Sequence, residues 1–210
     1  MSEASKPTRG RPKTLDRDHV LRTAMMQYWS KGPVDVSINE ICTLTGASKP
    51  GVYREFGSDD GLKKSVLDAY HSLAIQPLID VLEQDLSTQD TIDGLIGFMT
   101  QDRTALGIPQ GCLFVMMRAQ SQHFGAATQA ALTALRGDLF DAYAAWIARS
   151  KLRGDFADIP NDIAIHFIDA QHGGAMRMQR EGVPNQTIQA VLRAALGMLV
   201  PNGGPTPTAA

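Results

Sequence analysis

Two short helical segments separated by one glycine constrain the fold of this chain more than any other feature. Ser37 and Glu40 form a capping box, in which each side chain can accept a hydrogen bond from the other residue's backbone N–H, and this pattern begins a helix. That helix ends at Gly46, which supplies the backbone freedom of a tight turn. Ser48 is a good N-cap for the next helix. Two helices joined so closely are typical of a helix-turn-helix, which places its second helix in the major groove of DNA.

The residues on either side fit the same arrangement. Apolar residues recur at spacings of three and four from Val20 to Trp29, which predicts a preceding helix. In the helix after the turn, Val52 and Phe56 lie four apart and are expected to face inward. The side chains that can then point outward are those of Lys49, Gly51, Tyr53 and Arg54.

Positive charge is concentrated toward the N-terminus, although the chain carries a formal net charge of -2. Residues 1–71 hold eleven Lys or Arg against nine Asp or Glu, and the remainder holds nine against thirteen. This balance argues against a protein that binds nucleic acid over its whole surface. Residues 1–15 are interpreted as a flexible basic arm, because Lys6, Arg9, Arg11 and Lys13 lie among Pro and Gly residues. A solvated tail without function is the alternative.

Several features in register make residues 9–70 similar to the DNA-binding domain of the tetracycline-repressor (TetR) family. These features are the Arg-Gly-Arg-Pro-Lys arm, Ile41-Cys42, Gly46-Ala47-Ser48 at the turn, Val52-Tyr53 followed by Phe56, and Gly61-Leu62. The resemblance covers about sixty residues well, and the rest of the chain only in its helical character. It implies a ligand-responsive, sequence-specific transcriptional repressor that a small apolar or aromatic inducer releases from a pseudo-palindromic operator.

The resemblance also implies which residues approach DNA and how two chains associate. The expected DNA-binding residues are Arg9, Arg11, Lys13, Ser37, Ser48, Lys49, Gly51, Tyr53, Arg54 and Lys63. Of these, Tyr53 is expected to touch a phosphate or a thymine methyl group, and the basic side chains to anchor phosphates or read guanine. A homodimer through the last two long helices is expected, because both are rich in small and apolar residues.

One departure from the family pattern concerns Asp59-Asp60, where the family usually carries Lys-Glu with a lysine that contacts a phosphate. An aspartate favours a helix start through capping and the helix dipole, but it weakens the grip on phosphate. Lys63 and Lys64, one turn further on, could partly replace the lost charge. A solvated helix face is the alternative for both lysines.

The whole chain is expected to be all-α, with no strand pattern. The expected organisation is an arm at 1–15, a helix-turn-helix domain at 16–71, a ligand-sensing and dimerisation domain at 72–200, and a disordered tail at 201–210. A linking helix runs from 58 to about 83, with Pro77 expected to kink or break it. Further helices are expected at 90–102, 110–122, 125–150, 161–180 and 184–199. Close helix approach would explain Gly173-Gly174, since glycine disfavours an ordinary helix.

Aromatic, methionine and cysteine side chains of the C-terminal part are the candidates for the inducer pocket. The expected ligand-binding residues are Phe98, Cys112, Met116, Met117, His123, Tyr143, Trp146 and Phe167. Such residues would suit an apolar or planar ligand, although plain core packing is the alternative for each. Cys112 lies near a predicted helix start, where a lowered thiol pKa would make it an electrophile or oxidant sensor. A buried, inert cysteine is the alternative.

Other classes of protein fit the sequence less well. No catalytic motif connects His71, His123, His166 and His172 with the carboxylates, so an enzyme is not expected, nor is a cofactor. The pairs Asp162–His166 and Asp169–His172 make a metal site conceivable, with hydrogen bonding as the alternative. An architectural DNA-binding protein would lack sequence preference. No apolar run approaches the roughly 18 residues of a membrane span, and no secretory signal is present, so the expected location is the cytoplasm.

Overall fold

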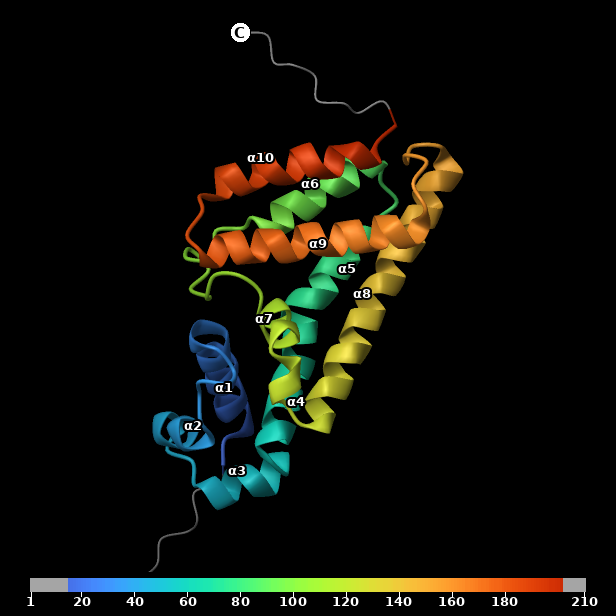
Figure 1. The fold of residues 1–210 in the computed structure, drawn as a ribbon. Coiled ribbons are helices and arrows are strands. Elements are labelled where there is room, and N and C mark those ends of the chain that lie inside the picture. The colour runs from blue at the N-terminus through green and yellow to red at the C-terminus, as the bar shows by residue number, and fades with distance from the viewer. Residues whose placement is uncertain (1–14, 202–210) are drawn as a thin grey trace, which may run out of the picture.

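The computed structural model describes residues 15–201, and the chain is all-α over this range (Figure 1). The helices are α1 (Arg17–Lys31), α2 (Ile38–Thr45), α3 (Lys49–Phe56), α4 (Asp59–Tyr70), α5 (Gln76–Glu83), α6 (Thr88–Met99), α7 (Leu113–Ala119), α8 (Ala126–Arg153), α9 (Asn161–Arg180) and α10 (Asn185–Leu196). A π-helical turn, η1 (His71–Ile75), and two 3-10 turns, η2 (Ser121–His123) and η3 (Gly197–Leu199), complete the description. The predicted basic arm and almost all of the predicted tail lie outside the described residues.

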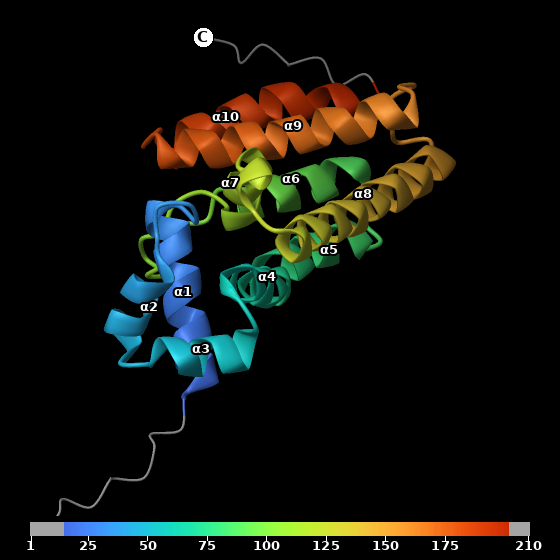
Figure 2. The same ribbon diagram turned by 60° about the horizontal axis from the view of Figure 1, so that its bottom comes forward.

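Two groups of helices lie at opposite ends of the molecule. The helices α1, α2 and α3, called the head below, form one end, and α6, α9 and α10 lie side by side at the other (Figures 1 and 2). The helices α5 to α10 are called the body below. The helix α4 leaves the head and packs along the long helix α8. None of the described helices combines the length and the hydropathy needed to cross a membrane.

The linking segment is helical throughout, but its helix type changes in the middle. Between α4 and α5, the backbone N–H of Gln76 donates to the carbonyl of His71, five residues earlier, which defines the π turn. Pro77 then lies in the first turn of α5. A proline has no N–H to donate and its ring crowds the preceding turn, so the widened turn lies where a regular helix would be disrupted. The predicted disturbance therefore takes the form of a π turn just before Pro77.

Several helix ends differ from the sequence prediction for local reasons. The predicted helix at 110–122 begins only at Leu113, because Gly111 has a φ of 80° and Cys112 is extended. The predicted helix at 90–102 begins earlier, at Thr88, because the Ser87 hydroxyl accepts a hydrogen bond from the Asp90 N–H. The helix predicted at 161–180 has the bounds of α9.

The glycine pair in α9 does not lie against another helix of the same chain. A Cβ atom built on Gly173 or Gly174 would meet no atom within 4 Å, apart from its immediate surroundings in the helix. Within the described residues no helix of the same chain approaches this pair, so the expected close approach would have to come from a partner chain.

A carboxylate on α4 connects the head side of the molecule to α8. Asp60 accepts hydrogen bonds from the backbone N–H groups of Ala127 at 3.0 Å and Thr128 at 3.4 Å. The Thr128 hydroxyl donates back to the Asp60 carbonyl at 3.0 Å. The N-cap of α8 is Gly125, which has no side chain to cap the helix, so Asp60 performs this task from another helix. Gly125 is also required for the approach, because a Cβ there would lie 2.5 Å from the Asp60 carboxyl carbon.

Replacing Asp60 with alanine removes both carboxylate bonds to α8. We expect the free energy of unfolding to fall by about 1–2 kcal/mol, the usual cost of losing a helix cap. Urea denaturation followed by circular dichroism measures this change. Asp141→Ala is the matched control, because Asp141 is exposed on α8 and makes no side-chain hydrogen bond within residues 15–201. A loss no larger than that of the control would contradict the capping role.

Candidate nucleic-acid interface and core cavity

Short-range hydrogen bonds shape the turn between α2 and α3. The Ser37 and Ser48 hydroxyls accept from the backbone N–H groups of Glu40 and Gly51, each at 3.2 Å, and begin the two helices. Gly46 ends α2 in the left-handed region with a φ of 68°, which favours glycine. The predicted capping box is only half formed, because the Glu40 carboxylate bonds the Lys31 ammonium at 2.5 Å instead of the Ser37 N–H.

The two faces of α3 have different chemistry. Val52 and Phe56 are buried against α1 and α4, as the spacing predicted. By contrast, Lys49, Tyr53 and Arg54 are exposed, and we call these three residues the outer face of α3. The Lys49 ammonium lies 5.7 Å from the centre of the Tyr53 ring, a cation–π distance. Neither cation of the outer face pairs with a carboxylate of residues 15–201, so both charges are open to solvent.

Two of the predicted DNA-binding residues are buried instead of facing outward. Gly51 packs inside the turn, where a Cβ would lie 2.9 Å from the Ser48 hydroxyl and 3.5 Å from a Leu15 methyl group. Its lack of a side chain thus serves the packing of the turn. Lys63 is only 7% exposed. Arg9, Arg11 and Lys13 lie outside the described residues.

The Asp59 departure has a structural role in this chain. The Asp59 carboxylate pairs with the Lys63 ammonium one turn later, and that ammonium lies 5.6 Å from the centre of the Tyr28 ring. Burial and the nearby Asp59 charge raise the pKa of the Tyr28 hydroxyl, so this ring stays neutral. Lys63 is therefore held inside by Asp59, and its ammonium lacks the exposure that a phosphate contact requires. Lys64 is exposed and pairs with Asp68 at 2.6 Å.

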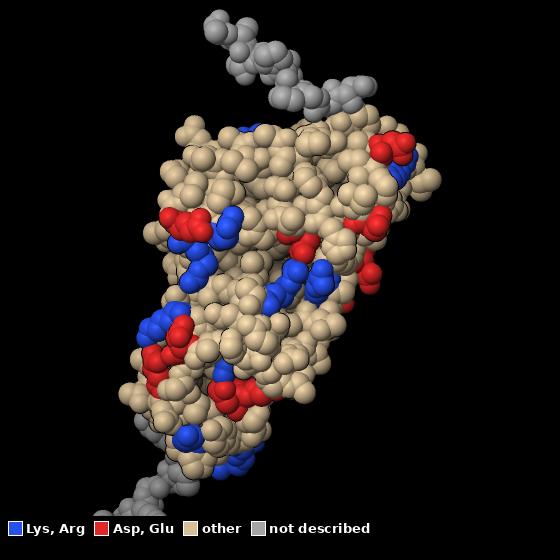
Figure 3. Space-filling view, in the orientation of Figure 1, with Lys and Arg blue, Asp and Glu red and all other residues tan. Residues whose placement is uncertain are grey.

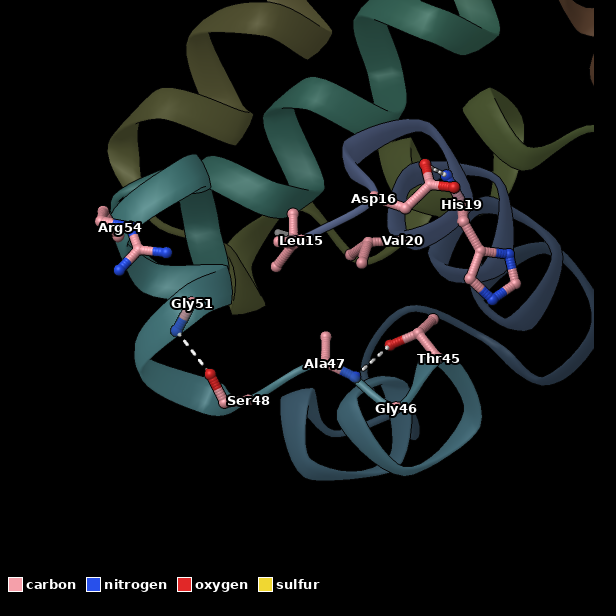
Figure 4. A pocket seen from close by; sticks show the side chains of 10 residues that line it. All are labelled: Leu15, Asp16, His19, Val20, Thr45, Gly46, Ala47, Ser48, Gly51 and Arg54. Carbon is pink, nitrogen blue, oxygen red and sulfur yellow. Dashed lines mark hydrogen bonds between the residues drawn. The ribbon is translucent and has the colours of Figure 1, made fainter. Parts of the chain in front are cut away.

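A hollow of about 490 Å³ separates the start of α1 from the turn between α2 and α3 (Figure 4). Leu15, Val20 and Ala47 form its apolar lining. The polar groups near its edge are already used in the fold, since Asp16 accepts the His19 N–H at 2.9 Å to cap α1. The hollow is therefore a feature of the head's packing, at the point where the described chain begins.

The candidate ligand residues do not gather around one pocket. A small cavity of about 10 Å³, roughly the space of one water molecule, lies in the core of the body. Among the eight candidates only Phe98 and Cys112 line it. The others lie elsewhere: Met117, Tyr143 and Trp146 are buried in the core, Met116 and Phe167 are half-buried, and His123 is exposed in η2.

Cys112 is buried and protonated in this structure. The Tyr70 hydroxyl donates to its sulfur at 3.2 Å and accepts the Leu113 N–H at 3.3 Å. Burial raises the pKa of the Cys112 thiol, and this effect outweighs the Tyr70 hydrogen bond, which lowers it. The predicted lowering of this pKa by a helix start is therefore wrong, and the thiolate that an electrophile sensor needs is disfavoured here.

The sequence prediction missed the two most polar residues of the cavity wall, Arg103 and His172. Arg103 lies in the loop after α6 and is 6% exposed, and its Nε donates to the Gln179 side chain at 3.1 Å. Burial, together with the positive charges of Arg118 and Arg103, lowers the pKa of His172 to about 4, although the negative charge of Asp169 opposes this effect. The His172 imidazole is thus neutral at pH 7, while Arg103 stays charged.

The residue pairs considered for metal binding have other partners or positions. Asp169 accepts two hydrogen bonds from the Arg118 guanidinium, at 2.8 and 3.0 Å, instead of facing a metal site with His172. The described residues contain no group of three or more His, Cys, Asp or Glu side chains placed to hold a metal ion.

The buried His172 gives a testable pH dependence. Below pH 6.5 the unfolded chain binds a proton at His172 that the folded chain binds only near pH 4, so the free energy of unfolding should fall as the pH drops through this range. The full effect is roughly 3 kcal/mol. Urea denaturation of His172→Gln between pH 7 and pH 4.5 should show a weaker pH dependence than the unmodified chain. His19→Gln, at an exposed position of α1, should not differ, and identical profiles for all three proteins would refute the assignment.

Known proteins with similar sequences are bacterial repressors. No protein-family model matches the chain. It is 30% identical over 115 residues, 54% of its length, to the HTH-type transcriptional repressor ComR of Escherichia coli (strain K12). It is 33% identical over 76 residues, 36% of its length, to the repressor BdcR of the same organism. These matches cover 55% of ComR and 39% of BdcR, so the chain spans about half the length of the curated relatives or less.

Solved structures match over nearly the whole chain. The TetR family transcriptional regulator CifR, a cysteine mutant complexed with 26-base-pair operator DNA, is similar at a TM-score of 0.76 and 26% identity, covering 90% of this chain and 100% of CifR. A regulatory protein TetR from Rhodobacter sphaeroides shares the fold at a TM-score of 0.75 and 16% identity, covering 89% and 100%. Together with the helix-turn-helix and the helical body, these similarities show that the chain resembles transcriptional regulators of the TetR family.

Proposed function

We propose that this chain is a ligand-responsive transcriptional repressor that binds a specific operator sequence through α3. The observation that carries the proposal is the outer face of α3, where two unpaired cations flank an exposed aromatic ring on a short helix braced by α2. A helix of this kind fits the major groove. The operator complex of the similar regulator CifR supports the proposal. Its place of action is the cytoplasm, where the DNA lies, and we propose no catalytic role.

In this proposal the residues of the outer face contact different parts of the DNA. Lys49 and Arg54 anchor phosphates or donate to guanine, and Tyr53 contacts a phosphate or a thymine methyl group. Arg9, Arg11 and Lys13 add charge from the N-terminal arm, and Ser37 and Ser48 lie at the helix starts nearest the backbone. Gly51 and Lys63 support the fold of the head and make no contact with DNA. The division of the chain into a DNA-binding part (16–71) and a sensing part (72–200) belongs to the same proposal.

A homodimer would present two heads to the two halves of a pseudo-palindrome. We place its interface on α9 and α10, whose surface shows few charged side chains in the view of Figure 3. Ile163 on α9 and Val191 on α10 are 57% and 42% exposed, as apolar residues at a subunit interface would be in the isolated chain. The open space at Gly174 would then accommodate a helix of the partner.

The DNA-binding proposal is tested with a duplex selected from a random library by the full chain. We expect Tyr53→Ala and Lys49→Ala each to weaken binding by about 5- to 150-fold, the range for losing a good contact of about 1–3 kcal/mol. Lys49→Ala should also reduce the salt dependence of binding, since a phosphate contact releases counterions. Fluorescence anisotropy at two salt concentrations measures both effects. Leu152→Ala, at an 89% exposed position of α8 remote from the head, is the control. Selection of no preferred sequence would point to an architectural protein instead.

The dimer is tested by filling the space at the glycine pair. Gly174→Leu should leave the single chain folded, because its Cβ meets nothing within 4 Å, but should shift the sedimentation of the protein from dimer toward monomer. Gly137→Leu is the matched control, because Gly137 lies on α8, is exposed and has equally open space. A Gly174→Leu protein that sediments like the control would rule out this interface.

A further inference from the structure

The buried Arg103 guanidinium has no negative partner among the described residues. Its Nε donates to Gln179, one terminal nitrogen lies 3.8 Å from the Met176 sulfur, and no carboxylate of residues 15–201 lies within ion-pairing distance. A guanidinium carries five N–H donors, and a thioether is a weak acceptor. Burying a charge without a counter-charge is unfavourable, so such groups are usually paired. Arg103 therefore differs from Arg118, which is paired with Asp169.

The wall around Arg103 combines this one charge with apolar surface. Tyr70, Cys112 and His172 add neutral polar groups, while Phe98, Met99 and Met176 supply aromatic and thioether surface. The neutral imidazole leaves Arg103 as the only charged group of the wall. A cavity with one fixed cation and an otherwise apolar lining is complementary to a molecule with one negative group on an apolar body.

We infer that the small molecule sensed by this chain is an organic anion, whose carboxylate pairs with Arg103 while its apolar part packs against Phe98 and the methionines. The inference rests on the proposed function and assigns the chemical class of the inducer. Because the cavity now holds only about 10 Å³, the anion binds a more open arrangement of the same walls. Binding thus shifts the chain between two arrangements of the body.

The position of Arg103 explains how such binding reaches the head. Its guanidinium carbon lies 5.8 Å from the centre of the Trp29 ring, which belongs to α1. Tyr70, at the end of α4, contacts the same indole edge-to-face at 5.1 Å. The wall of the cavity also contains Ala74 and Ile75 of the π turn. An anion that draws Arg103 away from Trp29 and separates the cavity walls therefore displaces two helices. These are α1, which belongs to the head, and α4, which connects the head to the body.

The test uses the full chain without DNA and three acids with their matched amides: benzoate and benzamide, cinnamate and cinnamamide, hexanoate and hexanamide. Isothermal titration calorimetry and thermal unfolding report binding. We expect at least one acid to bind at least tenfold more tightly than its amide and to raise Tm. Arg103→Met should abolish the preference for the acid, and Arg103→Lys should retain part of it. Arg136→Met, at an exposed position of α8, should bind like the unmodified chain.

Three results would overturn the inference: no acid binds, acids and amides bind equally, or Arg103→Met keeps the preference for the acid. If Arg103→Met does not fold, Arg103→Gln replaces it, because glutamine keeps a donor for Gln179 without the charge. The selected operator duplex separates this inference from the proposed function. If the chain binds DNA specifically but binds no acid, the anion site is refuted and the repressor role stands. Acid binding through Arg103 without specific DNA binding supports the anion site and removes the repressor role.

Discussion

Trp29 of α1 contacts residues of α4, of the loop between α6 and α7, and of α9, and the position of the head relative to the body depends on its packing. Its ring meets Tyr70 of α4 edge-to-face, and its Nε1 donates to the Gly111 carbonyl at 3.3 Å. The Arg180 guanidinium of α9 donates to the backbone carbonyl of Trp29 at 3.0 Å. Trp29 is 1% exposed, so its removal would open a large space that neighbours could fill only in part. The first helix of the head is thereby held by residues of the body as well as by its own neighbours.

A second connection, through Asp60 and the start of α8, lies on the other side of α4. Helix N-termini bind anions well, and here the carboxylate comes from the segment that leads out of the head. The residue before it, Asp59, holds Lys63 in the interior. Asp59 and Asp60, which differ from the residues usual in the family, thus both stabilise contacts within the chain. Among the described residues, the exposed cations of the proposed DNA interface therefore lie on α3.

The sequence was sufficient wherever neighbouring residues determine the structure. The turn at Gly46, the inward positions of Val52 and Phe56, and the bounds of α9 depend on spacing, capping and backbone freedom, which are local properties. The all-α class and the helix-turn-helix followed from these. The prediction that the Glu40 carboxylate accepts the Ser37 N–H was wrong, because Lys31, nine residues away in sequence from Glu40, competes for this carboxylate.

The core cavity could not be predicted, because its walls come from α4, the π turn, α6, the following loop and α9. Nothing in the residues around Arg103 distinguishes it from a solvated loop arginine, and its burial arises only when α9 packs over the loop. Pattern analysis favoured aromatic and sulfur side chains for the pocket, which found Phe98 and Cys112 but also selected residues that fill the core elsewhere. Long-range contacts of polar side chains, such as the contact between Arg103 and Gln179, produce no local sequence pattern.

The π turn fixes the number of residues between head and body. In an α-helix each residue advances the chain by about 100° around the axis, since 3.6 residues complete a turn. The π turn at His71–Ile75 takes up about one residue more per turn than an α-helix does, so a regular α-helix with the same number of residues would rotate α5 by about that angle relative to α4. Leu78, Ile79 and Leu82, which are buried, would then point away from the core. Related chains that have a regular helix in place of this π turn should therefore be one residue shorter in this segment.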